Sequence, residues 1–99
     1  MKVRFTPRAA LRAEKANKWW RENRPDTRDL FTHELAEAVK WLQTIPGIGT
    51  PHPTLRRPHL KRLLLEKTAC HVYFEVDEKK AEIRILMLWG APRGKEPKL

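Results

Sequence analysis

The stretch from Cys70 to Trp89 constrains the fold most, because it predicts two neighbouring strands joined by a short polar turn. "ACHVYFEVD" alternates between apolar and polar side chains, as a strand with one buried face does. "AEIRILMLW" follows it and is apolar on both sides over its second half. With the earlier run "LKRLLLEKT", these segments predict an antiparallel meander of strands. The last strand is expected in the interior of the sheet, since both of its sides are apolar.

The first half of the chain predicts one short strand and two helices. "KVRF" is typical of an edge strand, and a helix is expected from Pro7 to Asn23 with Thr6 as its N-cap. A second helix is expected to begin at a cap on Asp26 or Thr27 and to end before the Pro-Gly pair that follows "QTI". Two helices with so short a link form an antiparallel hairpin.

The segment "GIGTPHPTLRRPH" predicts a loop, because its prolines exclude it from the centre of a sheet. The predicted fold is therefore α+β with the order β-α-α-β-β-β. An antiparallel sheet carries a two-helix hairpin packed on one of its faces. Residues 1–99 are expected to form a single domain.

Strand alternation assigns side chains to the two faces of this sheet. The side expected to meet the helices carries Cys70, Val72, Phe74, Val76, Ile83, Ile85, Met87 and Trp89. The opposite side is expected to carry His71, Tyr73, Glu75, Arg84, Leu86 and Leu88. The helices would leave this second side bare for a macromolecule, and Leu86 with Leu88 would form an apolar docking strip there. A plainer interpretation of the polar residues is a solvated face with cross-strand pairs such as Glu75 with Arg84.

The net charge and the number of cysteines limit which kinds of partner and which cellular compartment are expected. Lys and Arg number 21 against 12 acidic residues, a net charge of +9, which favours an anionic partner but also serves solubility. In "LRRPHLKR", the cluster of cations predicts either electrostatic steering or a solvated rim. One cysteine excludes an internal disulfide, so a reducing cytoplasm is expected. Apolar runs are too short to predict a membrane span or a signal peptide, so no membrane partner is expected.

No metal or other cofactor is expected. The four histidines and Cys70 show no repeated ligand spacing of the kind that structural zinc sites have. Cys70 and His71 are adjacent on one strand and therefore face opposite ways, which excludes a catalytic dyad. Cys70 is interpreted as a small core residue.

Four segments, taken in order, resemble one known family along nearly the whole chain. They are "FTPRAALRAEKANKWWRENRP", "LFTHELAEAVKWLQTIPGIG", "RLLLEKTACHVYFEVDEKKAEIRILMLW" and the tail "GAPRGKEPKL". Their order and spacing resemble the RelE/ParE toxins of bacterial type II toxin–antitoxin systems, above all the ParE-like, plasmid-stabilisation branch. The resemblance implies a toxin neutralised by a cognate antitoxin and held with it in a hetero-oligomer.

The family implies two mechanisms. RelE-like members cut mRNA on the ribosome, and ParE-like members inhibit DNA gyrase. The nuclease pattern fits poorly, because His71 and Ala91 stand where RelE-like enzymes carry arginines, and the tyrosine or histidine near their C-terminus is absent. Gly90 stands where many ParE-like relatives carry histidine. The sequence therefore favours gyrase inhibition, with a ribosome-dependent mRNA endoribonuclease or a non-toxic degenerate member as alternatives.

The site residues follow from these two alternatives. Residues that could supply the acid, the base and the cations of a nuclease are His71, Tyr73, Glu75, Arg84 and Arg93. Residues predicted to bind the target are Arg62, His71, Tyr73, Arg84, Arg93 and Lys95. Residues predicted to contact the antitoxin are Trp19, Trp41, Leu86 and Leu88. Trp89 is expected to close the core, and the proline after it would hold Arg93 and Lys95 on a constrained loop.

Overall fold

The computed structural model describes residues 1–45, 47–90 and 96–99. Its elements are β1 (Lys2–Phe5), α1 (Pro7–Asn23), the 3-10 helix η1 (Pro25–Thr27), α2 (Leu30–Thr44), β2 (Thr50–Pro51), β3 (Lys61–Leu65), β4 (Cys70–Asp77) and β5 (Glu82–Gly90). The predicted α+β order is confirmed. The two-residue strand β2 was not predicted. The predicted cap of the second helix is wrong, because Asp26 and Thr27 lie in η1 and α2 begins after Asp29.

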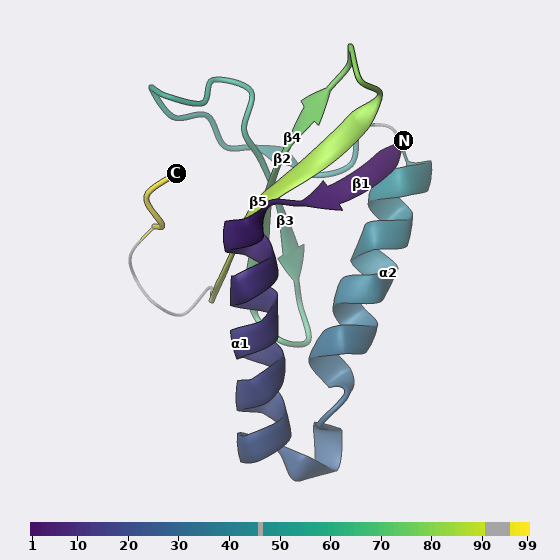
Figure 1. The fold of residues 1–99 in the computed structure, drawn as a ribbon, viewed down its shortest axis with the longest axis vertical. Helices are drawn as coiled ribbons and strands as arrows, with labels where there is room; N and C mark the ends of the chain where they lie inside the picture. Colours follow the sequence, from purple (N-terminus) through teal and green to yellow (C-terminus); the bar gives the residue numbers. More distant parts are fainter. Residues whose placement is uncertain (46, 91–95) are drawn as a thin grey trace.

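The five strands form one sheet in the order β1-β5-β4-β3-β2 (Figure 1). Strand β5 lies between β1 and β4, which confirms that the last strand is an interior one. It pairs with β4 in the antiparallel sense and with β1 in the parallel sense. The two helices lie side by side and extend beyond one end of the sheet (Figure 1).

Hydrogen bonds cap the start of α1 and hold α2 against the sheet. The Thr6 hydroxyl caps α1 by accepting a hydrogen bond of 3.1 Å from the backbone N–H of Ala9. On α2, the Glu34 carboxylate accepts three hydrogen bonds from the turn between β3 and β4. They come from the N–H of Lys67 at 2.8 Å, and from the N–H and hydroxyl of Thr68 at 2.9 and 2.7 Å. Glu34 therefore locks the hairpin to the end of the sheet.

The main core fills the space between the helices and one face of the sheet. It contains Ala9, Phe31, Ala38 and Leu42 from the helices, and the predicted strand residues Cys70, Val72, Phe74, Ile83 and Ile85. Trp20 and Leu35 pack against it from the two helices. The predicted inner side of β4 is thereby confirmed.

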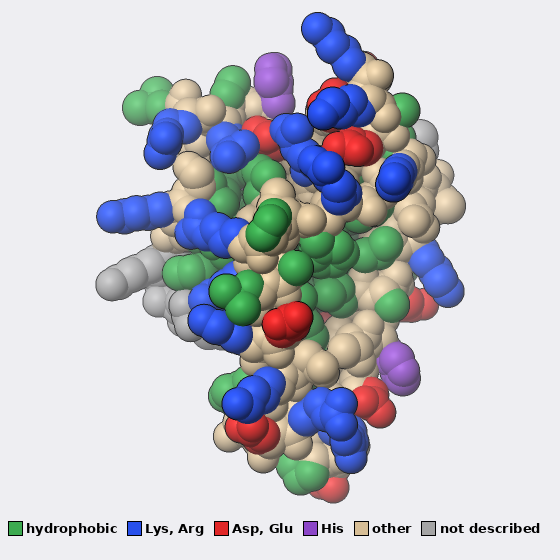
Figure 2. Space-filling model, viewed as in Figure 1, with side chains coloured by type: hydrophobic (Ala, Val, Ile, Leu, Met, Phe, Trp, Pro, Cys, Tyr) green, Lys and Arg blue, Asp and Glu red, His purple; other side chains and the backbone are tan. Residues whose placement is uncertain are grey.

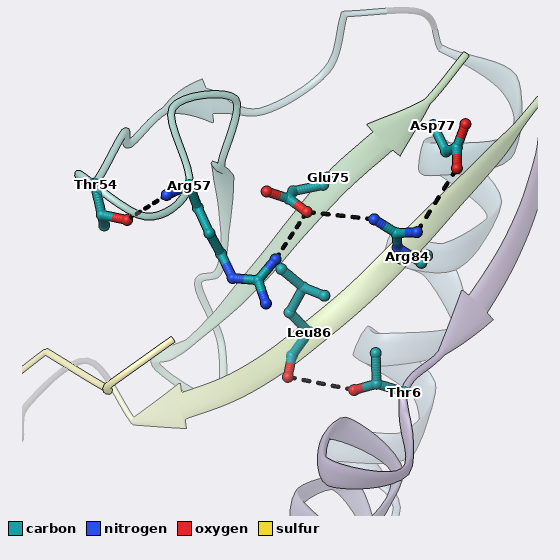
Figure 3. Close-up of polar contacts among 7 residues, drawn as sticks. All are labelled: Thr6, Thr54, Arg57, Glu75, Asp77, Arg84 and Leu86. Carbon is teal, nitrogen blue, oxygen red and sulfur yellow. Dashed lines mark hydrogen bonds and ion pairs between the residues drawn. The ribbon is translucent and has the colours of Figure 1, made fainter. Parts of the chain in front are cut away.

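A β-bulge in β5 changes the faces of its last residues. Tyr73 lies opposite Met87 and Phe74 lies opposite Ile85, so Leu86 has no opposing residue on β4. The Leu86 carbonyl instead accepts a hydrogen bond of 3.4 Å from the Thr6 hydroxyl (Figure 3). One extra residue inverts the alternation that follows it.

The bulge corrects three predictions made from strict alternation. Leu88 packs into the helix-side core, whereas Met87 and Trp89 belong to a cluster on the other face. The expectation that Met87 and Trp89 face the helices, with Trp89 closing the main core, is therefore wrong. The expected apolar docking strip is wrong as well, because Leu86 is only 7% exposed and Leu88 only 2% exposed.

A second, smaller core lies on the face away from the helices. Leu60, Tyr73, Leu86 and Met87 form it, and Trp89 and Leu99 pack against it. Leu60 comes from the loop before β3, and Leu99 comes from the end of the chain. The prediction of a bare face is therefore wrong around Tyr73, since two non-helical segments of the chain cover it.

Replacing Glu34 with alanine is expected to lower the free energy of unfolding by about 1–3 kcal/mol, because three hydrogen bonds to one carboxylate are lost. Urea unfolding at pH 7 measures the change. Glu37→Ala, an exposed position on the same helix, is the matched control. Equal stabilities of the two variants would contradict the role given to Glu34.

Candidate functional site

The candidate site is the open face, defined here as the side of β3, β4 and β5 that lies away from the helices. Register places Arg62 on β3 beside Tyr73 on β4, and Glu75 on β4 beside Arg84 on β5. Side chains of directly opposed residues project from the same face of a sheet. His71 lies two residues before Tyr73 on β4 and therefore on the same face. Five of the residues predicted as target-binding or catalytic are thus brought to one face: Arg62, His71, Tyr73, Glu75 and Arg84.

Ion pairs run across one half of the open face (Figure 3). One oxygen of the Glu75 carboxylate lies 3.0 Å from a guanidinium nitrogen of Arg57 and 3.5 Å from one of Arg84. Arg84 also lies 3.6 Å from the carboxylate of Asp77. Two guanidinium groups and two carboxylates cancel in charge, and the predicted cross-strand pair of Glu75 with Arg84 is confirmed.

The other half of the open face carries the phenol ring of Tyr73 and the imidazole rings of His52 and His71. The Tyr73 ring makes edge contacts with the rings of His52 at 5.7 Å and His71 at 6.1 Å between centroids. Tyr73 is only 1% exposed, so the expectation that it lies on a bare face is wrong. Burial, followed by the positive charge of Arg62, lowers the pKa of His71 below its ordinary value of 6.5. His71 is therefore an uncharged imidazole at neutral pH.

The C-terminal residues 96–99 fold back over this half of the face. The Glu96 carboxylate lies 2.7 Å from Nε2 of His52 and 3.9 Å from a guanidinium nitrogen of Arg62. Leu99 packs on the cluster around Tyr73. Arg62 thus faces a carboxylate in the folded chain. The predicted site residues Arg93 and Lys95 lie outside the described residues.

The arrangement limits the chemistry that the open face can perform. Cleavage of a phosphodiester bond needs cations directed at the phosphate, together with an acid and a base. Here Arg57 and Arg84 both point at Glu75 (Figure 3), and Tyr73 is buried. Among the described residues, no three His, Cys, Asp or Glu side chains are grouped so that they could hold a metal ion.

Sequence reasoning missed three residues that shape this face: His52, Arg57 and Glu96. Arg57 belongs to the basic cluster that the sequence showed, but its carboxylate partner lies 18 positions away on another element. His52 and Glu96 meet only because the end of the chain returns to the sheet. Spacing along the sequence carries no signal for either contact.

Two grooves border the helices, and the exposed tryptophans line them. Trp41, 50% exposed, lies with Leu30, Leu63 and Leu64 in a groove of about 810 Å³ between α2 and β3. Trp19, 48% exposed, lines a second groove between α1 and the ends of β4 and β5. The expectation that both tryptophans are partly exposed is confirmed.

Lys and Arg side chains are spread over the face seen in Figure 2, with hydrophobic side chains between them. None of the helices in the described part of the chain is long and apolar enough to cross a bilayer.

The fold is that of the RelE/ParE toxins. A chain of the chromosomal ParDE TA system from P. aeruginosa superposes with a TM-score of 0.70 at 24% sequence identity, over 91% of this chain and 95% of that chain. The isolated RelE toxin of E. coli superposes with a TM-score of 0.52 at 18% identity, over 95% of this chain and 87% of that chain. No protein-family model matches the chain, and no curated protein matches its sequence.

The lowered pKa of His71 predicts how stability depends on pH. The unfolded imidazole takes up a proton near pH 6.5, whereas the folded one resists protonation until lower pH. This residue's contribution to stability is thus complete above pH 6.5 and declines as the pH falls through that value toward the folded pKa. Urea unfolding from pH 8 to pH 5 should show His71→Gln losing less stability on acidification than the wild type.

The matched control for this measurement is His33→Gln, at an exposed position on α2. Parallel curves for the wild type and His71→Gln would show that burial of His71 has no effect on its protonation.

Proposed function

We propose that this chain is the toxin of a type II toxin–antitoxin pair that inhibits DNA gyrase by binding it, and that a cognate antitoxin neutralises it. The shared fold, at a TM-score of 0.70 to a chain of a ParDE system, supports the toxin class. The observation that carries the choice between binding and cleavage is the convergence of Arg57 and Arg84 on Glu75.

Binding is favoured over RNA cleavage by the electrostatics of the open face. An incoming phosphate would have to displace Glu75 from two guanidinium groups at 3.0 and 3.5 Å, and would meet the carboxylate's own negative charge. His71, with its lowered pKa, adds no positive charge at neutral pH. Binding to a folded protein does not require a phosphate-binding site on the toxin, so these features support a protein target.

The groove between α2 and β3 is the surface that fits the antitoxin. Strand β2 pairs only with Lys61 and Arg62, so the outer edge of Leu63–Leu65 has no neighbouring strand among the described residues. An extended segment can add to such an edge while its apolar side chains fill the groove beside Trp41. Trp41 is thereby the proposed anchor of the antitoxin, and Trp19 in the second groove is a proposed further contact.

The proposed activity is tested by two assays on the purified full chain. Inhibition of DNA supercoiling by gyrase is expected, without cleavage of ribosome-bound mRNA, because the cations of the open face are paired with carboxylates. Expression without antitoxin should arrest bacterial growth. Cleavage of the mRNA with unchanged gyrase activity would replace this proposal by the endoribonuclease, and no response in either assay with normal growth would indicate a non-toxic member.

Replacing Trp41 with alanine should weaken binding of the cognate antitoxin by about tenfold or more, because a large aromatic contact is lost. Titration calorimetry measures the affinity. Arg21→Ala, at an exposed position on α1 that lines neither groove, serves as the control and should bind as the wild type does. An affinity of Trp41→Ala equal to that of Arg21→Ala would place the antitoxin elsewhere.

A further inference from the structure

The loop between β2 and β3 carries the most exposed large apolar side chain of the described residues. Leu55 has a relative exposure of 104%, so its own chain covers none of it. In Figure 1 this teal loop projects on the opposite side of the molecule from α2. Single exposed leucines are common on protein surfaces, so the exposure alone does not define a site. Leu55 differs from an ordinary exposed leucine because its loop is held in one conformation by hydrogen bonds and prolines.

Hydrogen bonds close the loop at its base and at its tip. At the base, the His52 N–H donates to the Leu60 carbonyl at 2.9 Å. At the tip, Thr54 and Arg57 exchange backbone hydrogen bonds of 3.0 and 3.2 Å, and the Thr54 hydroxyl accepts a further one of 3.0 Å from the Arg57 N–H. Prolines at positions 51, 53 and 58 restrict the backbone further. Leu55 and Arg56 are thus held in one tight turn.

Two side chains attach this turn to the sheet. The Arg57 guanidinium donates a hydrogen bond of 3.0 Å to Glu75 on β4 (Figure 3). Leu60, only 1% exposed, is buried in the cluster with Tyr73 and Met87. The position of Leu55 is therefore fixed relative to the sheet. A backbone turn that is already ordered loses little conformational entropy when it docks.

The charges beside Leu55 indicate the chemistry of its partner. Arg56 is exposed and makes no ion pair with the described residues, unlike Arg57 next to it. An aliphatic side chain offers no ring on which a nucleic-acid base could stack, so a nucleic acid would leave Leu55 unused. An apolar pocket with carboxylates at its rim complements both Leu55 and Arg56.

We infer that the tip of this loop, Leu55 with Arg56, is the element that docks into the target protein, in an apolar pocket with an acidic rim on gyrase. This inference rests on the proposed function. It separates the two binding surfaces of the chain, since the antitoxin groove lies along α2 and the loop projects on the other side (Figure 1).

Two substitutions test the inference on the full chain with purified gyrase. Leu55→Asp should raise the concentration needed for half-inhibition of supercoiling by about tenfold or more, because the transfer of one leucine side chain out of water is lost. Arg56→Glu should raise it in the same direction, because it reverses the charge that meets the acidic rim. Leu11→Asp, at a half-exposed leucine on α1, is the matched control and should inhibit as the wild type does.

The midpoint of thermal unfolding and the affinity for the antitoxin should be unchanged in Leu55→Asp, because the side chain contacts nothing in the folded chain. Leu55→Ala provides a second variant should the aspartate disturb the turn. Wild-type inhibition by Leu55→Ala and Leu55→Asp would overturn the inference and leave the proposed function standing. Failure of the wild type itself to inhibit gyrase would overturn both.

Discussion

Leu86 in β5 has no partner residue on β4, and this β-bulge determines which side chains of β5 lie on each face of the sheet. Because β4 has no residue opposite Leu86, the side chains of Leu86 and Met87 both project away from the helices, while Leu88 turns back toward them. A regular strand would have placed Leu86 and Leu88 on the open face, which instead carries Leu86, Met87 and Trp89. Together with Tyr73 on β4 and Leu60 from the loop before β3, these residues make a second core. That core gives the loop before β3 and the end of the chain a surface on which to pack.

The same bulge marks the limit of what the sequence could predict. Regular alternation placed every side chain of β4 on its correct face, and it placed β5 correctly as far as Ile85. Beyond that point it inverted Met87, Leu88 and Trp89, since a bulge adds one residue without a distinctive local composition. Apolar residues on both sides of the strand fit either register equally well. The pair of Glu75 with Arg84 was predictable because the two residues lie before the bulge. The contacts of Arg57 and Glu96 were not, because both depend on how a loop and a chain end return to the sheet.

The net charge of +9, which favoured an anionic partner, is a poor guide to the open face. Three arginines of the described residues reach this face, and each lies within 4.0 Å of a carboxylate: Arg57 and Arg84 beside Glu75, and Arg62 beside Glu96. Paired charges on a partly buried sheet hold a loop or a chain end in place more readily than they attract a distant phosphate. The net positive charge of the whole chain can still steer an acidic protein surface toward it.

The two proposed partners would bind to two surfaces of this small molecule, and these surfaces differ in kind. The groove beside α2 offers an unpaired strand edge and apolar walls, which suit an extended segment that becomes ordered as it binds. The loop around Leu55 is already ordered, so it suits a folded target whose surface cannot adapt. Its order depends on Glu75, which holds Arg57, and on Leu60, which is buried in the second core. The ion pairs that make the open face a poor phosphate site are therefore the same contacts that make the loop a rigid one.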